Sequence, residues 1–533
     1  TDWVNLGMAI AEGRESMDPF DDAIRALRAF AKTKTKAELL DRALAMNLLI
    51  APITTTADVL ELPQLEERSY WQLLEVGASG QPTRPVRVPG SVAKTSPPLH
   101  SLAPAPTLGS GRLRTRHQPT ASPPSAPGLE APDPGARALD GLKVLDFMWA
   151  VAGPAATRVL ADHGATVVKI ESESRPDVIR GVNPFIGEDG GQENALQFHS
   201  LNAGKLDLTL DMSCPEARDV VLDLVRWCDV LTESFSPRAM ANWGLGYDDL
   251  LAVNPHLIMF SSSLMGQTGP MRLYAGFGTM AAAVAGFYPV TGWPDRNPAG
   301  PFTAYTDYIS PRMSVALILA ALEQRRVTGR GQHIDFAQLE GALHYLAPQL
   351  LDQEINGRTA GRHGNDDAHM APHGVFAAAG DDRWLAIACE TDDHWAALAR
   401  VIGRHDLSGL TLQERRMHSE ELATAITAWT TDRSPADGQA ELQAVGVPSH
   451  MVNDAYDMII DDQLSHRNHY QQASHPIHGM TWVESGNCRF SRTPASIGWA
   501  GPMFGQHNME VLDGILGYDG DRIAELVIAG AIA

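Results

Sequence analysis

The chain has 533 residues, enough for two to four domains with apolar cores of their own. Its contents of 44% hydrophobic and 20% charged residues are ordinary for a soluble globular protein. The formal net charge of −22 argues against nucleic acid and anionic membranes as partners, because an acidic surface repels both. The sequence shows no signal peptide and no long uncharged apolar run, so we expect a cytoplasmic protein.

The N-terminal 137 residues divide into two segments of different composition. Residues 1–79 carry apolar side chains at helical spacing, for example in 21–31 and 36–49, and we predict a mostly helical segment. Residues 80–137 are dense in Pro, Ser, Ala and Gly and show no helical or strand period. Such a stretch buries too little apolar area to offset its ordering entropy, so we predict a mostly disordered linker there.

After the linker, short apolar or β-branched runs alternate with helical segments. The runs expected as strands are 143–147, 166–171, 230–235 and 257–262. This alternation predicts βαβ units and an α/β fold with a Rossmann-like, doubly wound parallel sheet. The first strand–helix turn reads WAVAGPAATR and lacks the G-x-G-x-x-G fingerprint, so we infer neither NAD nor FAD.

Part of the sequence is repeated. Residues 30–71 resemble residues 429–470, and Gln64 answers Gln463 at the same offset of 399 (463−64) at which Arg68 answers Arg467 (467−68). The simplest interpretation is that residues 1–79 are the C-terminal tail of one copy and that the linker leads into a second, complete copy.

With these elements placed, residues 139–533 resemble the family III CoA-transferases, the CaiB/BaiF family. Seven blocks stand in the family's order: LDGLKVLDFMWAVAGPAATRVLADHGATVVKIES, NAGKLDLTLDM, LTESFSPRAMANWGLGYDDLLAVNPHLI, GQTGP, DYISPRMSVALILAALEQRRVTGRGQHIDFAQLEGAL, MAPHGVFAAAGDDRWLAIAC and FGQHNMEVLDGILGYDGDRIAEL. The resemblance implies a large Rossmann-like domain from 138–350, a smaller α+β domain at 351–475, and a C-terminal return to the large domain at 476–533. It also implies dimers interlocked like chain links, or pairing with another CoA-transferase copy.

The same resemblance implies the chemistry. Family members move CoA from an acyl-CoA to a carboxylic acid through an aspartate, which forms a mixed anhydride and then an aspartyl thioester. Acyl-CoA and acid are then the small-molecule partners, coenzyme A enters only as substrate, and neither a metal nor a permanently bound cofactor is expected.

Asp307 falls on the position of that aspartate. The alternative from the residues themselves is a helix cap, since Asp often caps a helix. Ser310 followed by Pro311 predicts a helix start of its own, which makes Asp307 dispensable for capping. The resemblance therefore favours Asp307 as the nucleophile.

The positions that contact CoA carry over less cleanly. The family's CoA entrance matches Ala150 and Val151 in the turn after the first strand. The segment that is often Glu-Asn-Phe reads Glu-Ser-Phe here and places Ser234 and Phe235 at the site. Two basic residues, Arg180 and Lys205, have side chains suited to CoA phosphates, with surface solubility as the alternative.

Two other functions remain open at this stage. An α-methylacyl-CoA racemase resembles the same blocks but requires a histidine in the segment that matches residues 274–286, and that segment contains none. A non-catalytic partner subunit of a CoA-transferase is the other alternative, against which the presence of Asp307 argues.

Overall fold

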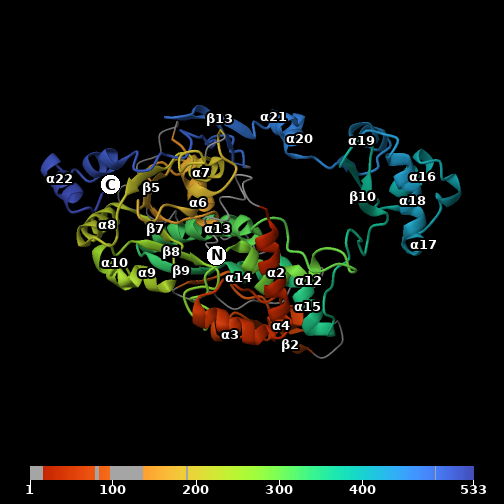
Figure 1. Cartoon of the computed structure of the whole chain (residues 1–533), viewed down its shortest axis with the longest axis horizontal. Coiled ribbons are helices and arrows are strands. Elements are labelled where there is room, and N and C mark those ends of the chain that lie inside the picture. The colour runs from red at the N-terminus through yellow and green to blue at the C-terminus, as the bar shows by residue number, and fades with distance from the viewer. Residues whose placement is uncertain (1–15, 78–82, 96–135, 188–189, 487, 533) are drawn as a thin grey trace, which may run out of the picture.

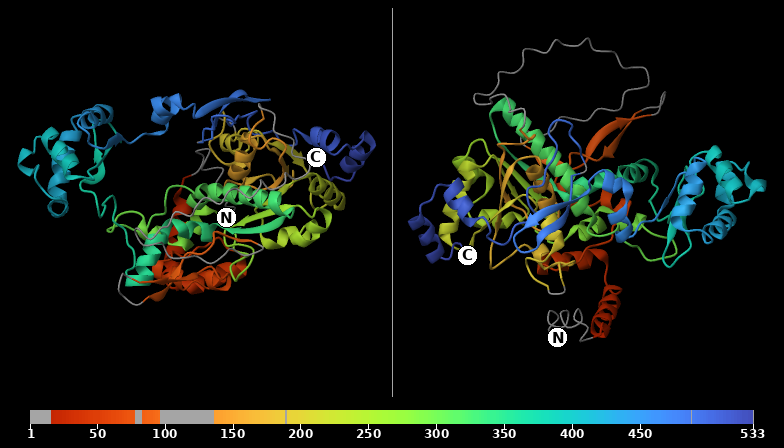
Figure 2. Two further views of the ribbon diagram at one scale, coloured as in Figure 1. Left: turned by 180° about the vertical axis from the view of Figure 1, so that it is seen from behind. Right: turned by 90° about the horizontal axis from the view of Figure 1, so that it is seen from above.

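The computed structural model describes residues 16–77, 83–95, 136–187, 190–486 and 488–532. A body built around a seven-stranded sheet carries a smaller unit at one side, which stands apart and joins the body through extended chain (Figures 1 and 2). No helix within these described ranges has both the length and the hydropathy that crossing a bilayer requires.

The sheet has the strand order β3-β9-β8-β7-β4-β5-β6, and the predicted doubly wound parallel sheet is confirmed. Strands β4 to β9 run parallel, and only β3 is antiparallel to its neighbour β9. The strands are β3 Ala93–Thr95, β4 Lys143–Phe147, β5 Thr166–Glu171, β6 Leu206–Thr209, β7 Val230–Glu233, β8 Ile258–Ser263 and β9 Gln332–Ala337. After β4 the chain adds β5 and β6 on one side and then β7, β8 and β9 on the other, so the order reverses between β4 and β7.

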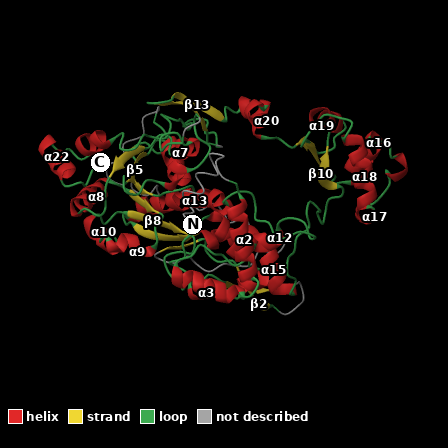
Figure 3. Cartoon of the chain, in the orientation of Figure 1, coloured by secondary structure: helices red, strands yellow, loops and turns green. Residues whose placement is uncertain are grey.

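Helices cover both faces of this sheet (Figure 3). One face carries α6 (Ala152–Asp162) and α13 (Tyr305–Thr328), and the other carries α8 (Pro215–Trp227), α10 (Tyr247–Val253) and α22 (Gly520–Ile528). The remaining helical elements of the body are η1 Val178–Gly181, α7 Leu196–Leu201, α9 Pro237–Asn242, α11 Gly278–Ala285, α12 Phe287–Val290, α14 Gln338–Leu343, η2 His344–Leu346, α15 Ala347–Asn356 and η4 Glu510–Ile515.

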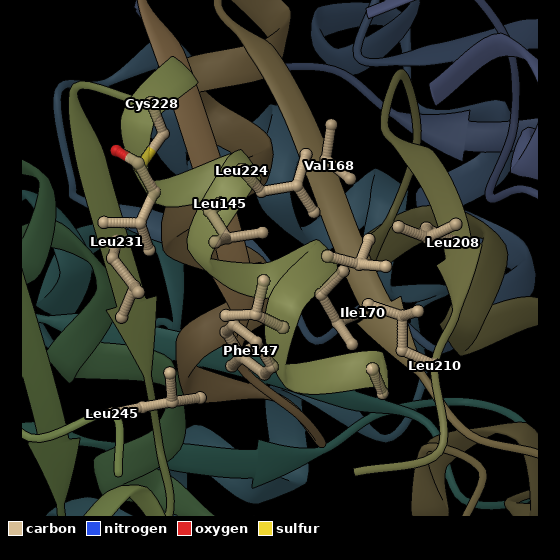
Figure 4. Packing of buried hydrophobic residues seen from close by; sticks show 14 of the residues in the cluster. Leu145, Phe147, Val168, Ile170, Leu208, Leu210, Leu224, Cys228, Leu231 and Leu245 are labelled. Carbon is tan, nitrogen blue, oxygen red and sulfur yellow. The ribbon is translucent and has the colours of Figure 1, made fainter. Parts of the chain in front are cut away.

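Alternate strand residues supply the two cores, as the period of two in a strand requires. Leu145 and Phe147 of β4 pack with Leu224 of α8 (Figure 4), whereas Val144 of the same strand packs with Ile318 of α13 on the opposite face. Burying each such side chain contributes about 1.5–3 kcal/mol, so both helix layers are held to the sheet by hydrophobic contact.

The smaller unit has its own core around Trp395. Its antiparallel sheet contains β10 His373–Ala377, β11 Trp384–Ala388 and β12 Ser449–Met451, and its helical elements are α16 Asp392–Val401, η3 His405–Leu407, α17 Leu412–Met417, α18 Ser419–Thr430 and α19 Pro435–Ala444. From it the chain returns through α20 (Ala455–Ile460) and α21 (Asp462–His466).

A hairpin crosses the expected domain boundary at residues 475–476. Strand β13 (Tyr470–His475) pairs with β14 (Gly479–Glu484), and its Ala473 packs with Val483 and with Ala203 of the body. The return to the body therefore begins with β13, because the paired strands and their shared apolar contacts cannot be divided between two domains.

The N-terminal segment contains helices, as predicted, and also strands that were not predicted. Its elements are α2 Asp18–Ala31, α3 Lys36–Met46, α4 Thr56–Leu60, α5 Pro63–Glu67, β1 Gln72–Val76 and β2 Arg84–Val88, followed by β3. The expectation of a disordered linker from residue 80 onward is wrong for residues 84–95. Val86 and Val88 are buried at alternate positions of β2, and β3 hydrogen-bonds to β9 as an edge strand of the main sheet. Residues 96–135 of the expected linker lie outside the described residues.

The repeat seen in the sequence is also a structural repeat. Helices α3, α4 and α5 and the hairpin β1–β2 follow in the same order as α19, α20, α21 and the hairpin β13–β14. Thr55 and Asp454, 399 residues apart (454−55), are both N-caps with a capping box. Ser69 and Asn468 (468−69) both have a left-handed backbone, with φ of 50° and 52°. The two segments therefore form the same local structure.

Candidate active site

The carboxyl ends of the parallel strands mark where a ligand site is expected. In open α/β sheets ligands bind outside these ends at the point where the strand order reverses, which here lies between β4 and β7. Helix α13 leads through a short turn into β9 and packs against it, so its first turn lies near the end of β9. There Thr306 donates a hydrogen bond to the side chain of Gln338, which directly follows β9, over 2.7 Å. Asp307 thus lies at this edge of the sheet.

Asp307 is a buried carboxylate with few stabilising contacts. Only 5% of the residue is exposed. The backbone N–H of Gly278 donates to its Oδ2 over 2.9 Å, and the side chain of Gln338 hydrogen-bonds to the carboxylate. Burial raises the pKa of Asp307, and the two hydrogen bonds reduce that rise without cancelling it. The result is a carboxylate that is less stable as an anion, and more reactive, than one in water.

The start of α13 differs from the expected one. The sequence predicts a helix beginning at Ser310 and Pro311, but the helix begins at Tyr305 and contains Pro311 in its interior. The earlier turn forms because Thr306 and Ile309 are buried in the body. Proline has no N–H to donate to the carbonyl of Asp307, four residues before it, so the first turn lacks one helical bond at this residue.

Asp307 does act as a cap, although of another helix. Gly278 is the first residue of α11, and its N–H would otherwise be one of the unpaired donors of that helix's N-terminus. A Cβ at Gly278 would lie 2.8 Å from Cγ of Asp307 and 2.6 Å from the carbonyl oxygen of Ala304. Only glycine permits this approach, and it places the positive end of the α11 dipole on the carboxylate.

This arrangement bears on the racemase alternative. Residues 274–286, which would have to supply a histidine for proton transfer, include α11 and lie against Asp307. The whole segment is described and its contact with the carboxylate is through Gly278, so these residues bring no imidazole to Asp307.

Four of the predicted CoA-contacting residues gather where β4 and β7 end. The N–H of Trp149 donates to Oγ of Ser234 over 3.1 Å, which joins the two turns. Ala150 has a left-handed φ of 63°, and its N–H donates to Asp177 over 2.8 Å. Val151, next to it, is the N-cap of α6, and the ring of Phe235 meets that of Trp149 edge-on at 5.3 Å. A left-handed alanine is strained and is held by its surroundings, as is common at functional sites.

Arg180 and Lys205 are not available to CoA phosphates. Arg180 is 1% exposed and forms a two-bonded ion pair with Glu171 of β5. Lys205 is fully buried, and its ammonium group donates to Asp146, to Asn202 and to the carbonyl of Pro154. Both cations neutralise carboxylates inside the body, since a buried charge is tolerated only when it is paired.

A buried acid that was not predicted from the sequence lies at the same edge. Glu233, the last residue of β7, is 2% exposed and accepts a hydrogen bond from the N–H of Phe235 over 2.8 Å. Burial raises its pKa to about 7. The sequence contained a signal for it, because Glu233 is an acidic residue at the end of an apolar strand.

The described residues show no cluster of three or more His, Cys, Asp or Glu side chains that could hold a metal ion. The four cysteines are free thiols. Cys228 and Cys389 are buried, Cys214 is half-buried and Cys488 is exposed.

Comparison with known proteins agrees with this geometry. The model of CoA-transferase family III matches residues 5–112 and 139–508, in two separate stretches. The chain is 33% identical over 396 residues to a succinyl-CoA–D-citramalate CoA-transferase of Chloroflexus aurantiacus, covering 73% of this chain and 97% of that protein.

A second relative matches almost the whole chain. The probable CoA-transferase Rv1866 of Mycobacterium tuberculosis is 27% identical over 555 residues, which cover 98% of this chain and 67% of that protein. Among solved structures, a CaiB/BaiF family protein from Brucella suis superposes with a TM-score of 0.66 at 31% identity, over 72% of this chain and all of that one. The chain therefore belongs to CoA-transferase family III, the CaiB/BaiF family.

Proposed function

We propose that this protein transfers CoA from an acyl-CoA donor to a carboxylic acid acceptor through covalent intermediates on Asp307. The observation that supports this most directly is the position of Asp307 itself. It is a buried carboxylate with a raised pKa, in the first turn of α13 and against the N-terminus of α11. A carboxylate that is poorly stabilised as an anion is well suited to attack a thioester carbonyl.

Four acyl transfers complete the exchange. A carboxylate oxygen of Asp307 attacks the thioester carbonyl of the donor, the C–S bond breaks, and CoA leaves as thiolate from a mixed anhydride. The thiolate then attacks the aspartyl carbonyl, which releases the donor acid and forms an aspartyl thioester. The acceptor carboxylate attacks that thioester and again frees the thiolate. Attack of the thiolate on the acceptor's acyl carbonyl gives the new acyl-CoA and restores Asp307.

The contacts of Asp307 assist these steps. Oxyanion charge develops beside Asp307 in each transfer, and the N–H of Gly278 with the positive end of α11 is directed at the same carboxylate. The side chain of Gln338 restrains the carboxylate from the other side and is itself held by Thr306. Both contacts are made by the folded chain itself, so the carboxylate is held in a preorganised position.

CoA is proposed to enter at the turns where β4 and β7 end. Ala150 and Val151 supply backbone at the start of α6, and Ser234 and Phe235 supply the facing turn. This is the position at which open α/β sheets commonly receive nucleotide-containing ligands. Coenzyme A serves here as substrate rather than as a permanently bound cofactor.

We further propose that the body pairs with another CoA-transferase body, either in a homodimer or through another copy. The repeat supports this. Val59 and Leu60 of α4 are buried against the body, whereas their equivalents Met458 and Ile459 on α20 are 40% and 64% exposed. A matching body would cover this exposed apolar surface as this one covers α4.

Substitution of Asp307 tests the catalytic proposal. Asp307→Ala and Asp307→Asn should abolish CoA exchange and the acyl-CoA-dependent, hydroxylamine-sensitive adduct on the peptide that contains residue 307, as read by mass spectrometry. Asp249→Asn is the matched control, because Asp249 also lies in the first turn of a helix but is exposed. Exchange that persists in both Asp307 variants would refute the assignment.

The acids are best sought with a donor and acceptor panel. Relatives of this chain are named for succinyl-CoA with citramalate or glutarate and for acetyl-CoA with oxalate, and these pairs form the first set. We expect exchange with at least one short acyl-CoA and one carboxylic acid, measured as the mass of the new acyl-CoA.

A further inference from the structure

The N-terminal segment packs directly on the elements that surround Asp307. The hydroxyl of Thr54 donates a hydrogen bond to the carbonyl of Val284, at the C-terminal end of α11, over 2.6 Å. Helix α5 then faces the loop after β8, residues 264–271, and the junction of β9 and α14. The first repeat copy thus touches three elements of the candidate active site of the second.

We propose that Gln64 and Arg68 of α5 are positioning residues for Asp307, so that the site in residues 139–508 is complete only with side chains of the N-terminal copy. The proposal rests on Asp307 as the nucleophile. It assigns to the two side chains a clamp that holds the loop 264–271 and the residues around Gln338 in the arrangement that catalysis uses.

Gln64 holds the loop through its backbone. Its amide nitrogen donates to the carbonyls of Met265 and Thr268, over 2.7 and 2.8 Å, and its amide oxygen accepts from the N–H of Met271 over 2.7 Å. Gln64 is fully buried. One side chain therefore satisfies three backbone groups of a loop that has no regular structure of its own, and removing it leaves them unpaired in the interior.

Arg68 joins that loop to the end of the sheet. Its guanidinium forms two hydrogen bonds to Glu340 of α14, one to Asp335 of β9 over 2.7 Å, and one to Oγ1 of Thr268 over 3.0 Å. Arg68 is 1% exposed, and both carboxylates are almost as deeply buried. The planar fork of arginine matches a carboxylate in a fixed geometry that lysine cannot reproduce.

Two glycines of the loop leave the space that the side chains of Arg68 and Gln64 occupy. A Cβ at Gly266 would lie 2.3 Å from Cζ of Arg68, and a Cβ at Gly269 would lie 2.5 Å from Oε1 of Gln64. Both glycines also have positive φ, 84° and 91°. The two side chains of the N-terminal copy occupy the space that any other residue would need at these positions.

The clamp reaches Asp307 through α14, and it reaches Glu233 through the loop after β8. Gln338, which hydrogen-bonds to Asp307, and Glu340, which pairs with Arg68, both lie in the first turn of the six-residue α14. Asp335 also accepts from the N–H of Gln267 over 2.9 Å, and the side chain of Gln267 approaches Glu233. A shift of Arg68 therefore moves the residues that orient the nucleophile, and a misplacement of about 1 Å costs on the order of a hundredfold in rate.

The corresponding residues of the second copy have different surroundings in this chain. Gln463 and Arg467 lie exposed on and just after α21, whereas Gln64 and Arg68 are buried. The clamp is thus a property of where the first copy docks and not of the repeated sequence alone.

The test compares Arg68→Lys with Arg326→Lys in the full chain. Arg326 holds Glu323 by the same two-bonded fork but on the exposed surface of α13. Arg68→Lys keeps the buried charge, and we expect the rate of the Asp307 adduct per titrated active site to fall about tenfold to a hundredfold, with KM for acyl-CoA changed by less than about threefold. Deuterium uptake should rise in residues 264–271 and 338–343, and Arg326→Lys should change neither quantity.

Gly266→Ala provides a second route to the same displacement, since its methyl group would meet Arg68 while every charge is kept. The double variant Arg68→Gln, Glu340→Gln removes both partners of one buried ion pair together. It therefore tests the clamp without leaving the Glu340 carboxylate buried and unpaired, which could prevent folding. If the adduct rate per active site stays unchanged while uptake rises in these variants, Arg68 is structural only and the proposal fails. If uptake does not change either, there is no clamp. Neither outcome bears on the proposed function, which is tested separately by the Asp307→Asn variant.

Discussion

At the scale of the residue, the state of Asp307 results from opposing influences. Burial raises its pKa because water no longer stabilises the anion. The N–H of Gly278 and the side chain of Gln338 lower the pKa because their hydrogen bonds stabilise the anion. The same two contacts fix the direction in which the carboxylate points. Reactivity and orientation therefore depend on the same pair of hydrogen bonds.

Replacing Gln338 should reveal the effect of its hydrogen bond on Asp307 apart from that of Gly278. Gln338→Leu removes a donor that favours the charged form, so the pKa of Asp307 should rise further. The acidic limb of the pH–rate profile for adduct formation should move to higher pH, with a smaller effect well above the limb. A limb that stays in place, or moves to lower pH, would contradict this role of Gln338.

Glu233 makes a pH-dependent contribution to stability. Burial raises its pKa from the usual 4.5 to about 7. Between these values the unfolded chain releases the proton while the folded chain keeps it, so the free energy of unfolding falls as pH rises from 4.5 to 7. For this residue the loss amounts to about 3 kcal/mol.

Glu233→Gln should remove that dependence. We expect the variant to gain stability over the unmodified chain at pH 8 and to show little difference at pH 4.5, measured by urea unfolding at both values. Other buried acids, such as Asp162 with its pKa raised to about 6, act in the same direction, and the comparison with the variant subtracts them. An equal effect of the substitution at both pH values would show that Glu233 ionises normally.

At the scale of the element, α13 contains a proline near its start, so one helical hydrogen bond of the first turn is missing. Pro311 lies inside the helix and cannot donate to the carbonyl of Asp307. Helices rarely retain a proline in the interior, since the missing bond and the steric conflict cost about 3 kcal/mol relative to alanine. Its position four residues after Asp307 places the missing helical bond at the carbonyl of the proposed nucleophile.

Pro311→Ala should raise the free energy of unfolding and lower the rate of adduct formation. The new N–H can bond to the carbonyl of Asp307, and we expect the free energy of unfolding to rise by about 1–2 kcal/mol once the greater freedom of the unfolded chain is subtracted. Adduct formation should slow, because Asp307 would follow the regular helix. Thermal unfolding and the adduct rate are measured on the same preparation, and a variant unchanged in both would show that Pro311 does not shape the turn.

At the scale of the whole molecule, the two repeats have the same local structure but different surroundings. The first copy places its α4–α5 unit on the body and adds β3 to the edge of the sheet, whereas α20 and α21 leave Met458, Ile459 and Ile460 exposed. The apolar helix face that is buried in the first copy and exposed in the second is the surface at which we propose that this chain pairs with another body.

Ile459→Asp should weaken that contact. Ile459 corresponds to Leu60, which is 7% exposed, and a charge at the centre of an apolar interface should lower the association constant at least about tenfold. Sedimentation velocity measures the assembly state, and the unfolding transition should not change. Ile528→Asp is the control, because Ile528 is 86% exposed on α22 and lies outside the repeat. Identical behaviour of the two variants would exclude α20 as an interface.

Much of this architecture could be predicted from the sequence, and the parts that could not share one physical cause. Alternating strand and helix periods are local, so the parallel sheet and the repeat were visible in the residues, and the order of the sequence blocks identified Asp307 as the candidate nucleophile. The pairing of buried charges is not local. Arg180 and Lys205 turn inward to Glu171 and Asp146, and Arg68 reaches Glu340 across 272 residues of chain. Such contacts can be known only from the folded chain. A buried cation pairs with whichever carboxylate is buried beside it, and that depends on how distant segments pack together.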